Sequence, residues 1–185
     1  MPLLPAEPWV FPAELLTPGS VDNAAARWLV MHTRPRAEKA LARQLLGSRV
    51  PFFLPLYQRR WRSAGRERRS FLPLFPGYIF LKADADQRLT ALKTNLVVQT
   101  LHVEDQILLE EDLGRIWRVL HSDEPLSPEE RLVPGTLVEI RSGPLAGLQG
   151  KVLRRGKKFK LFIEVHFLQR GVSLEIDESC LEPVS

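Results

Sequence analysis

A change in hydrophobic spacing near residue 134 constrains the fold of this chain more than any other feature. Beyond it, apolar residues occupy every second position of one stretch: Phe159, Leu161, Ile163, Val165 and Phe167. This spacing puts side chains on one face of a β-strand, and the glycines of the region disfavour a helix. Since closing short strands into a barrel removes their exposed edges, we predict a small all-β barrel over residues 134–185.

Residues 27–121 mix strand and helix patterns. An apolar run at residues 28–32 indicates a buried strand, and apolar residues spaced four apart then indicate an amphipathic helix with Thr33 as its cap. Further apolar runs, with Asp86 placed to cap a second helix, extend the order to β-α-β-β-β-α-β-α. This order predicts an α+β domain in which helices flank an antiparallel sheet.

Proline-rich segments bound this domain on both sides. Residues 1–26 hold five prolines and no clear periodicity, so we expect a poorly ordered N-terminal extension. Residues 122–133 hold two prolines and several acids, a composition typical of a linker. The predicted organisation is therefore an extension, an α+β domain, a linker and a barrel.

The sequence holds no pattern typical of an active site or a metal site. Its four histidines lack metal-ligand spacing, Cys180 has no cysteine or histidine nearby, and there is no Gly-x-Ser-x-Gly motif. A small enzyme is the third hypothesis, and no residue supports it. We therefore predict a non-catalytic protein with no metal and no cofactor.

Three features bear on the compartment. No apolar run approaches the roughly 20 residues that a membrane-spanning helix needs. The N-terminus lacks the basic start of a secretory signal, and a single cysteine fits a reducing environment. We therefore expect a cytoplasmic protein without membrane contact.

The net charge of +4 is unevenly distributed. Residues 32–69 hold eleven Lys or Arg and two acids, whereas residues 102–130 hold two Arg and nine acids. Six of the arginines fall between Arg59 and Arg69 around Gly65, in a pattern typical of a β-hairpin. Arginines at this density bind phosphates without reading sequence, although any single one is equally explained as a solvated surface residue. We predict nucleic-acid contact through Arg59, Arg60, Trp61, Arg62, Arg66, Arg68 and Arg69, with Trp61 placed to stack on an unpaired base.

Six aromatic residues lie close to several prolines in the stretches before and after the predicted hairpin. They are Phe52, Phe53, Tyr57, Phe75, Tyr78 and Phe80. Because aromatic side chains are usually buried, we expect at least half of these six residues to lie in the hydrophobic core. The remainder would form an apolar patch of the kind that binds a protein partner.

Together these residues resemble the NusG family of transcription elongation factors, including its specialised RfaH-like members. The matching pieces are Trp28–Thr33, Leu74–Phe80, Pro134–Gly135, Val138–Ile140 and Gly143–Gly150. The last block looks like the KOW motif, which ribosomal proteins also carry. The tryptophan-led strand and the Phe-Pro-Gly-Tyr strand, followed by a KOW block, are the specific part of the resemblance.

The resemblance implies an elongation factor that binds the clamp helices of the largest subunit of RNA polymerase near upstream DNA. The resemblance also implies that such a factor suppresses transcriptional pausing and modulates termination or antitermination. Clamp binding would fall on Tyr57, Phe75, Tyr78 and Phe80, and the basic hairpin would face DNA near the transcription bubble. An SH3-like KOW barrel would recruit a small-subunit ribosomal protein or Rho through Phe167, Leu168 and Arg170. We expect a monomer.

Two departures from the family pattern indicate a specialised paralog. The stretch Asn95–Leu101 lacks the glycines of housekeeping members, and the lead-in of about 26 residues is unusual. The alternative is an RNA-binding or ribosome-associated KOW protein that does not act on polymerase. Exposure of the strand Tyr78–Phe80 distinguishes the two readings, because a buried strand leaves the hairpin and barrel to make the contacts.

Overall fold

The computed structural model describes residues 7–17, 24–63, 65–122, 124, 126–129, 135–155 and 158–184. The chain divides into two compact units, Met1–Gln106 and Ile107–Ser185. The division falls at the start of the third helix and not in the expected linker at residues 122–133. That helix, α3 (Gln106–Leu120), therefore belongs almost entirely to the second unit.

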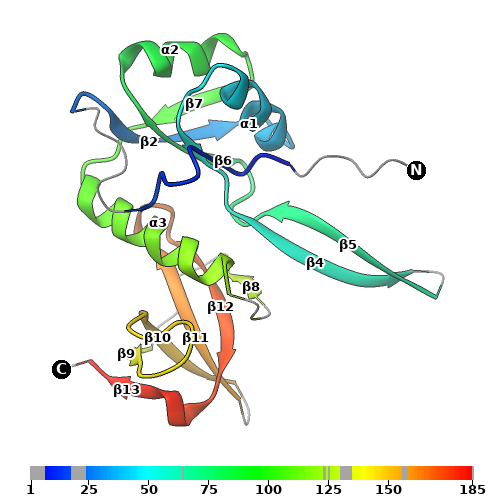
Figure 1. Cartoon of the computed structure of the whole chain (residues 1–185), viewed down its shortest axis with the longest axis vertical. Helices are drawn as coiled ribbons and strands as arrows, with labels where there is room; N and C mark the ends of the chain where they lie inside the picture. Colours follow the sequence, from blue (N-terminus) through cyan, green and yellow to red (C-terminus); the bar gives the residue numbers. More distant parts are fainter. Residues whose placement is uncertain are drawn as a thin grey trace. The chain divides into compact units, whose positions relative to one another are not determined.

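A five-stranded antiparallel sheet forms the centre of the first unit (Figure 1). Its strands, in spatial order, are β1 (Val10–Phe11), β3 (Phe52–Phe53), β6 (Tyr78–Ala83), β2 (Arg27–Thr33) and β7 (Val97–Leu101). Two helices join them, α1 (Glu38–Gly47) and α2 (Ala85–Lys93). The predicted antiparallel sheet with helices is confirmed in this mixed α/β unit.

The apolar face of α1 packs against one face of this sheet. Leu41 and Leu45 are buried in one cluster with Met31 of β2 and with Ile79 and Leu81 of β6. The four-residue spacing of the helix matches the two-residue spacing of the strands, so both present continuous apolar surfaces. Burial of each such side chain contributes about 1.5–3 kcal/mol.

Both predicted helix caps are wrong. Thr33 ends β2, and α1 begins only at Glu38, after a turn in which Arg36 has a φ of 61°. The cap of α2 is Asp84, because its carboxylate accepts the main-chain N–H of Gln87 while the Gln87 side chain accepts the N–H of Asp84. This reciprocal pair needs Gln three residues after the cap, a spacing that Asp86 does not have.

Part of the expected N-terminal extension is built into the first unit. Val10 and Phe11 pair with Phe53 and Phe52, and the ring of Trp9 lies 6.1 Å from that of Phe53. Leu15 is buried. The expectation of poor order overlooked these apolar residues, which complete the sheet edge next to β3; residues 1–6 and 18–23 of the extension lie outside the described part.

The second unit consists of α3 and a six-stranded antiparallel sheet. In spatial order the strands are β13 (Leu181–Pro183), β9 (Thr136–Ile140), β10 (Gln149–Arg155), β11 (Lys158–Val165), β12 (Arg170–Ile176) and β8 (Leu126–Glu129). The alternating apolar residues of β11 are buried from Leu161 to Val165. β8 lies in the expected linker, where its four residues pair with β12. Closure of these strands into a KOW barrel stays a prediction.

Two glycines let neighbouring strands of this sheet approach closely. A Cβ on Gly171 would lie 2.1 Å from the carbonyl oxygen of Ile163, and one on Gly150 would lie 2.6 Å from that of Phe162. Since both clashes are with backbone, no side-chain rotation relieves them.

Gly171→Ala should therefore lower the free energy of unfolding by about 1–3 kcal/mol through overpacking. Gly114→Ala is the matched control, because a Cβ on Gly114 within α3 meets nothing within 4 Å. It should stabilise the helix by about 1 kcal/mol. Thermal unfolding followed by circular dichroism measures both, and equal midpoints for the two variants would contradict the close strand approach.

Candidate nucleic-acid interface

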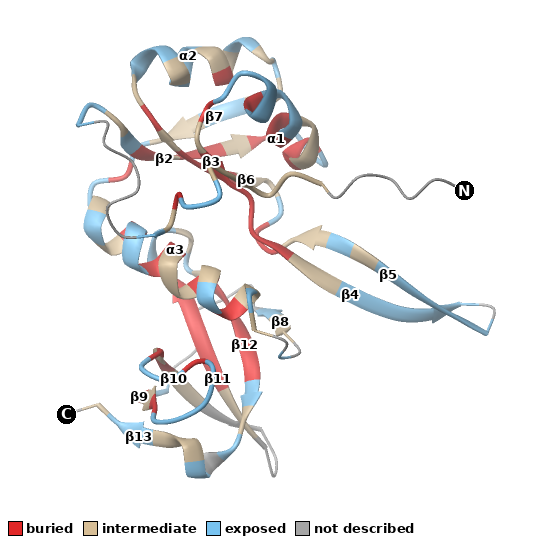
Figure 2. Ribbon diagram, in the orientation of Figure 1, coloured by how far each residue is buried: buried red, intermediate tan, exposed pale blue. Residues whose placement is uncertain are grey.

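The predicted basic hairpin is a separate two-stranded sheet in the first unit. Strands β4 (Leu56–Ser63) and β5 (Arg66–Pro73) pair over eight residues each, and Gly65 in the turn has a φ of 73°. Figure 1 shows the hairpin extending away from the five-stranded sheet of its unit. Figure 2 shows that its outer half is exposed. The sequence located this element correctly, and Ala64 of its turn lies outside the described residues.

Both faces of the hairpin are basic. Successive side chains of a strand point to opposite faces, and directly paired residues share a face. The register pairs Arg60 with Arg69 and Trp61 with Arg68. One face therefore carries Arg60, Arg62 and Arg69, and the other carries Arg59, Arg66 and Arg68.

The hairpin keeps a net positive charge, because it holds six arginines and a single acid, Glu67, which lies opposite Arg62. All six arginines are exposed, and none forms an ion pair with any residue that the structure describes. Arg60 donates to the Gln58 side chain at 2.8 Å, while Arg69, directly opposite, carries the same charge. Like charges opposite one another destabilise a strand pair. The arrangement therefore favours an external polyanion.

Trp61 lies among these arginines with 41% of its surface exposed. Arg68 is opposite it, and Arg59 is two residues away on the same face. Aromatic rings in such basic surroundings stack on unpaired bases, and guanidinium groups bind the neighbouring phosphates. Phe71, 50% exposed, provides a second uncovered aromatic ring on the opposite face.

Two of the four residues expected to bind polymerase are buried. Phe75 and Phe80 are 1% and 0% exposed, and their rings pack edge to face at 6.0 Å. Phe80 also lies 6.4 Å from Phe53, its partner across the β3–β6 ladder. Both side chains are therefore interior in this structure, because β6 is covered on both faces and buries Ile79, Phe80 and Leu81 in succession. Their contact with polymerase stays a prediction.

The two tyrosines of that set remain accessible. Tyr57 and Tyr78 are half-buried, so each presents part of its ring and its hydroxyl to the surface. Tyr78 stacks on His32 at 5.2 Å, and Tyr57 faces Leu72 across the hairpin. They come from adjoining parts of the first unit, the base of the hairpin and the start of β6.

The expected partner loop of the second unit is a short 3-10 turn, η1 (His166–Leu168), followed by β12. Phe167 is 37% exposed, and Leu168 and Arg170 are half-buried. The structure thus brings these three residues together on one turn, where Gln169 has a φ of 52°.

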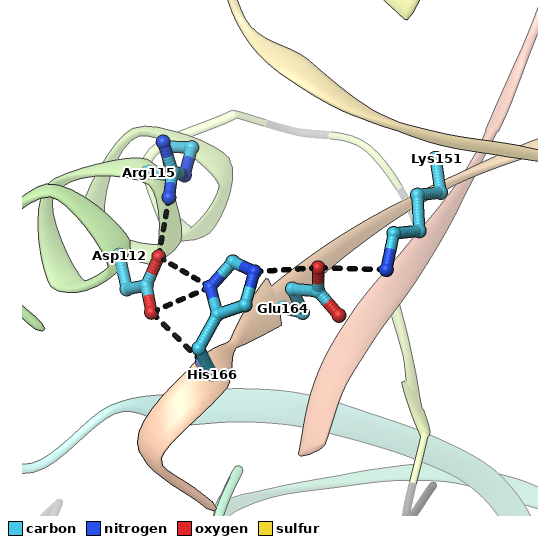
Figure 3. Close-up of polar contacts among 5 residues, drawn as sticks. All are labelled: Asp112, Arg115, Lys151, Glu164 and His166. Atoms are coloured by element: carbon cyan, nitrogen blue, oxygen red, sulfur yellow. Dashed lines mark hydrogen bonds and ion pairs between the residues drawn. The ribbon is translucent and has the colours of Figure 1, made fainter. Parts of the chain in front are cut away.

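One cluster was missed by the sequence. It joins α3 to two strands of the second unit through Asp112, Arg115, Lys151, Glu164 and His166 (Figure 3). The one available signal was Asp112, an acid placed within the apolar stripe of α3. No spacing rule brings together groups from four separate elements, α3, β10, β11 and η1.

A cavity of about 840 Å³ lies in the second unit. Its lining is apolar at Ile140 and Leu174 and acidic at Glu175 and Asp177, and none of its described lining residues is Lys or Arg. Two hydrogen bonds from Ser179 lower the pKa of Asp177; the larger effect comes from its main-chain N–H and the smaller from its hydroxyl. An acidic lining repels phosphates, which leaves the hairpin as the candidate interface.

Further features limit the chemistry of the described residues. They hold no group of three or more His, Cys, Asp or Glu arranged for a metal ion. No helix in the described part of the chain is both long and apolar enough to cross a membrane.

Comparison with known proteins gives a consistent result. Residues 26–113 match the family model described as transcription termination factor NusG. A solved structure on domain interaction in NusG of Thermotoga maritima matches with a TM-score of 0.50. It is 15% identical, and the match covers 86% of this chain and 98% of that chain, a likeness that concerns the fold alone. No curated protein matches in sequence.

The family match begins one residue before the tryptophan-led strand and includes the hairpin, β6 and most of α3. The shared fold extends over both units. On these grounds residues 26–113 form a domain of the NusG family of transcription factors.

Proposed function

We propose that the chain acts during transcription elongation by binding RNA polymerase through its first unit while the hairpin contacts DNA near the transcription bubble. The NusG-family domain at residues 26–113 supports a role in transcription elongation and termination. The observation that carries the finer proposal is the exposed six-arginine hairpin, which lacks ion pairs within the described chain. NusG proteins are non-catalytic, so the chain acts by binding in the cytoplasm, where bacterial transcription takes place.

The polymerase contact is assigned to Tyr57 and Tyr78. The resemblance directs this unit to the clamp helices of the largest polymerase subunit, and these tyrosines are the accessible members of the expected set. An aromatic ring that also carries a hydroxyl suits a protein interface with both apolar and polar groups. Phe75 and Phe80 support this surface from below and do not form it.

The effect on elongation follows from differential binding. A factor that binds the pause-resistant conformation of polymerase more tightly shifts the population toward it. A tenfold preference corresponds to about 1.4 kcal/mol, enough to change the fraction of paused complexes without a chemical step.

The second unit recruits a further partner in this proposal. Phe167 and Leu168 of η1 and Arg170 at the start of β12 combine apolar and cationic groups. The resemblance points to a small-subunit ribosomal protein or to Rho. The glycine-poor stretch Asn95–Leu101 supports a specialised, RfaH-like role on particular operons.

Burial of Phe75 and Phe80 favours a second candidate, an RNA-binding or ribosome-associated KOW protein that does not act on polymerase. The hairpin suits RNA phosphates as well as DNA phosphates. The two candidates differ in whether core polymerase binds the chain.

Polymerase binding tests the first candidate. The double variant Tyr57→Ala/Tyr78→Ala should weaken capture of core RNA polymerase by about tenfold or more, because it removes two aromatic contacts at an interface. Leu89→Ala is the matched control, since Leu89 is 48% exposed on α2, away from the hairpin. A wild-type chain that captures no polymerase supports the ribosome-associated candidate instead.

Salt dependence tests the hairpin. The triple variant Arg59→Gln/Arg62→Gln/Arg66→Gln should weaken binding to DNA of any sequence and reduce the slope of log K against log salt by roughly 2–3. The control Arg141→Gln should leave the slope unchanged, because Arg141 pairs with Glu182 at 2.9 Å in the second unit. Fluorescence anisotropy with labelled oligonucleotides measures the slope for each protein. Equal slopes for the wild type and the triple variant would show that the hairpin does not contact DNA.

A further inference from the structure

Asp112 is an unusual residue for the inner face of a helix. Its side chain is 0% exposed within the apolar stripe of α3. Its carboxylate accepts the main-chain N–H of His166 at 2.8 Å and faces the ring Nδ1 of His166 at 3.1 Å, and it also accepts from Arg115. A buried carboxylate is stable only with such partners. His166 therefore supplies much of the stabilisation that Asp112 receives.

The other ring nitrogen of His166 faces a second carboxylate. Nε2 lies 2.8 Å from Oε1 of Glu164 on β11, and the same oxygen contacts Nζ of Lys151 on β10 at 2.9 Å. Oε2 of Glu164 is buried and has no hydrogen-bond partner among the described residues. Figure 3 shows the resulting chain of contacts from α3, through the imidazole, to the strands.

A charged imidazole can donate on both sides of this contact. A neutral ring carries one N–H, and its other nitrogen presents a lone pair. Because both nitrogens of His166 face carboxylate oxygens, only the doubly protonated ring donates on both sides. The charged groups around it are Asp112 and Arg115 on α3, Glu164 on β11 and Lys151 on β10, and β12 contributes Arg170 opposite Val165.

We propose that His166 is a proton-dependent latch that fastens α3 to the sheet of the second unit through Asp112 and Glu164. The charged ring bridges helix and strand. When the pH rises and the ring loses its proton, one carboxylate loses its donor and faces a lone pair. Arg115 and Lys151 then remain as cationic partners on opposite sides. The main-chain N–H of His166 still donates to Asp112, so α3 is held by fewer contacts and separates from the strands more readily.

The latch also connects α3 to the proposed partner loop, a consequence that rests on the proposed function of the second unit. His166 is the first residue of η1, and Phe167 follows it directly. Asp112 holds both the ring and the main-chain N–H of His166. Asp112 and His166 are therefore positioning residues that set how Phe167 is presented.

Amide exchange of the full chain tests the latch. Exchange across residues 106–120, corrected for its intrinsic pH dependence, should accelerate about tenfold or more as the pH rises from about 5 to about 8. Ring ¹⁵N shifts measured in parallel should show both nitrogens of His166 protonated while α3 is protected. His166→Gln should abolish the pH-dependent step, and His102→Gln should keep it, because His102 is an exposed histidine of the first unit.

A second variant tests the latch if His166→Gln does not fold. Glu164→Gln keeps a side chain of the same size on β11 and removes the charge that Nε2 faces, so it should reduce the pH-dependent step. Ring shifts showing one protonated nitrogen while α3 is protected would overturn the proposal, as would a step that persists in His166→Gln. Capture of polymerase by the first unit should be equal in wild type and His166→Gln, so loss of the latch is distinguishable from failure of the proposed function.

Discussion

The pairing of β2 with β6 determines where the functional groups of the first unit lie. Six consecutive residue pairs join these strands, and β7 and β3 add to their outer sides. β6 follows the hairpin after a short turn, so its position in the sheet fixes the base of the hairpin. The N–H of Leu74 donates to the carbonyl of Pro55 at 2.8 Å and closes that base. A rigid sheet thus supports an exposed hairpin that has no packed face of its own.

The hairpin can carry six arginines without an ion pair to any described residue because its outer half is exposed. Water and salt weaken the repulsion between exposed like charges, which would be prohibitive in a buried position. The same charges gain most when a phosphate backbone replaces that water and releases its counterions. The arrangement therefore exchanges a modest loss of stability in the free protein for binding to a polyanion.

Local patterns in the sequence predicted those elements whose cause is local. The alternation from Phe159 to Phe167 identified β11, and the spacing of Ala37, Leu41 and Leu45 identified α1. The arginine run around Gly65 identified the hairpin. The two helix caps failed for different reasons. Thr33 is the last residue of β2 and α1 begins without a side-chain cap, whereas α2 uses the reciprocal pair of Asp84 and Gln87.

Long-range packing accounts for the remaining differences. Sequence cannot show that Phe80 points inward, since an alternating strand has two faces and the partners decide which is covered. Val10 and Phe11 joined the sheet because β3 offered an open edge, a fact visible only in three dimensions. The cluster around His166 likewise depends on the placement of α3 against β10 and β11.

The central claim is that the arginine hairpin lies on DNA while the chain is bound to polymerase. Replacing Trp61 with a photo-crosslinking amino acid in a reconstituted elongation complex tests this most directly, with each nucleic-acid strand labelled separately. The account predicts a crosslink to DNA near the transcription bubble, lost when polymerase is omitted at high salt. A chain that joins the elongation complex and crosslinks no DNA would contradict it.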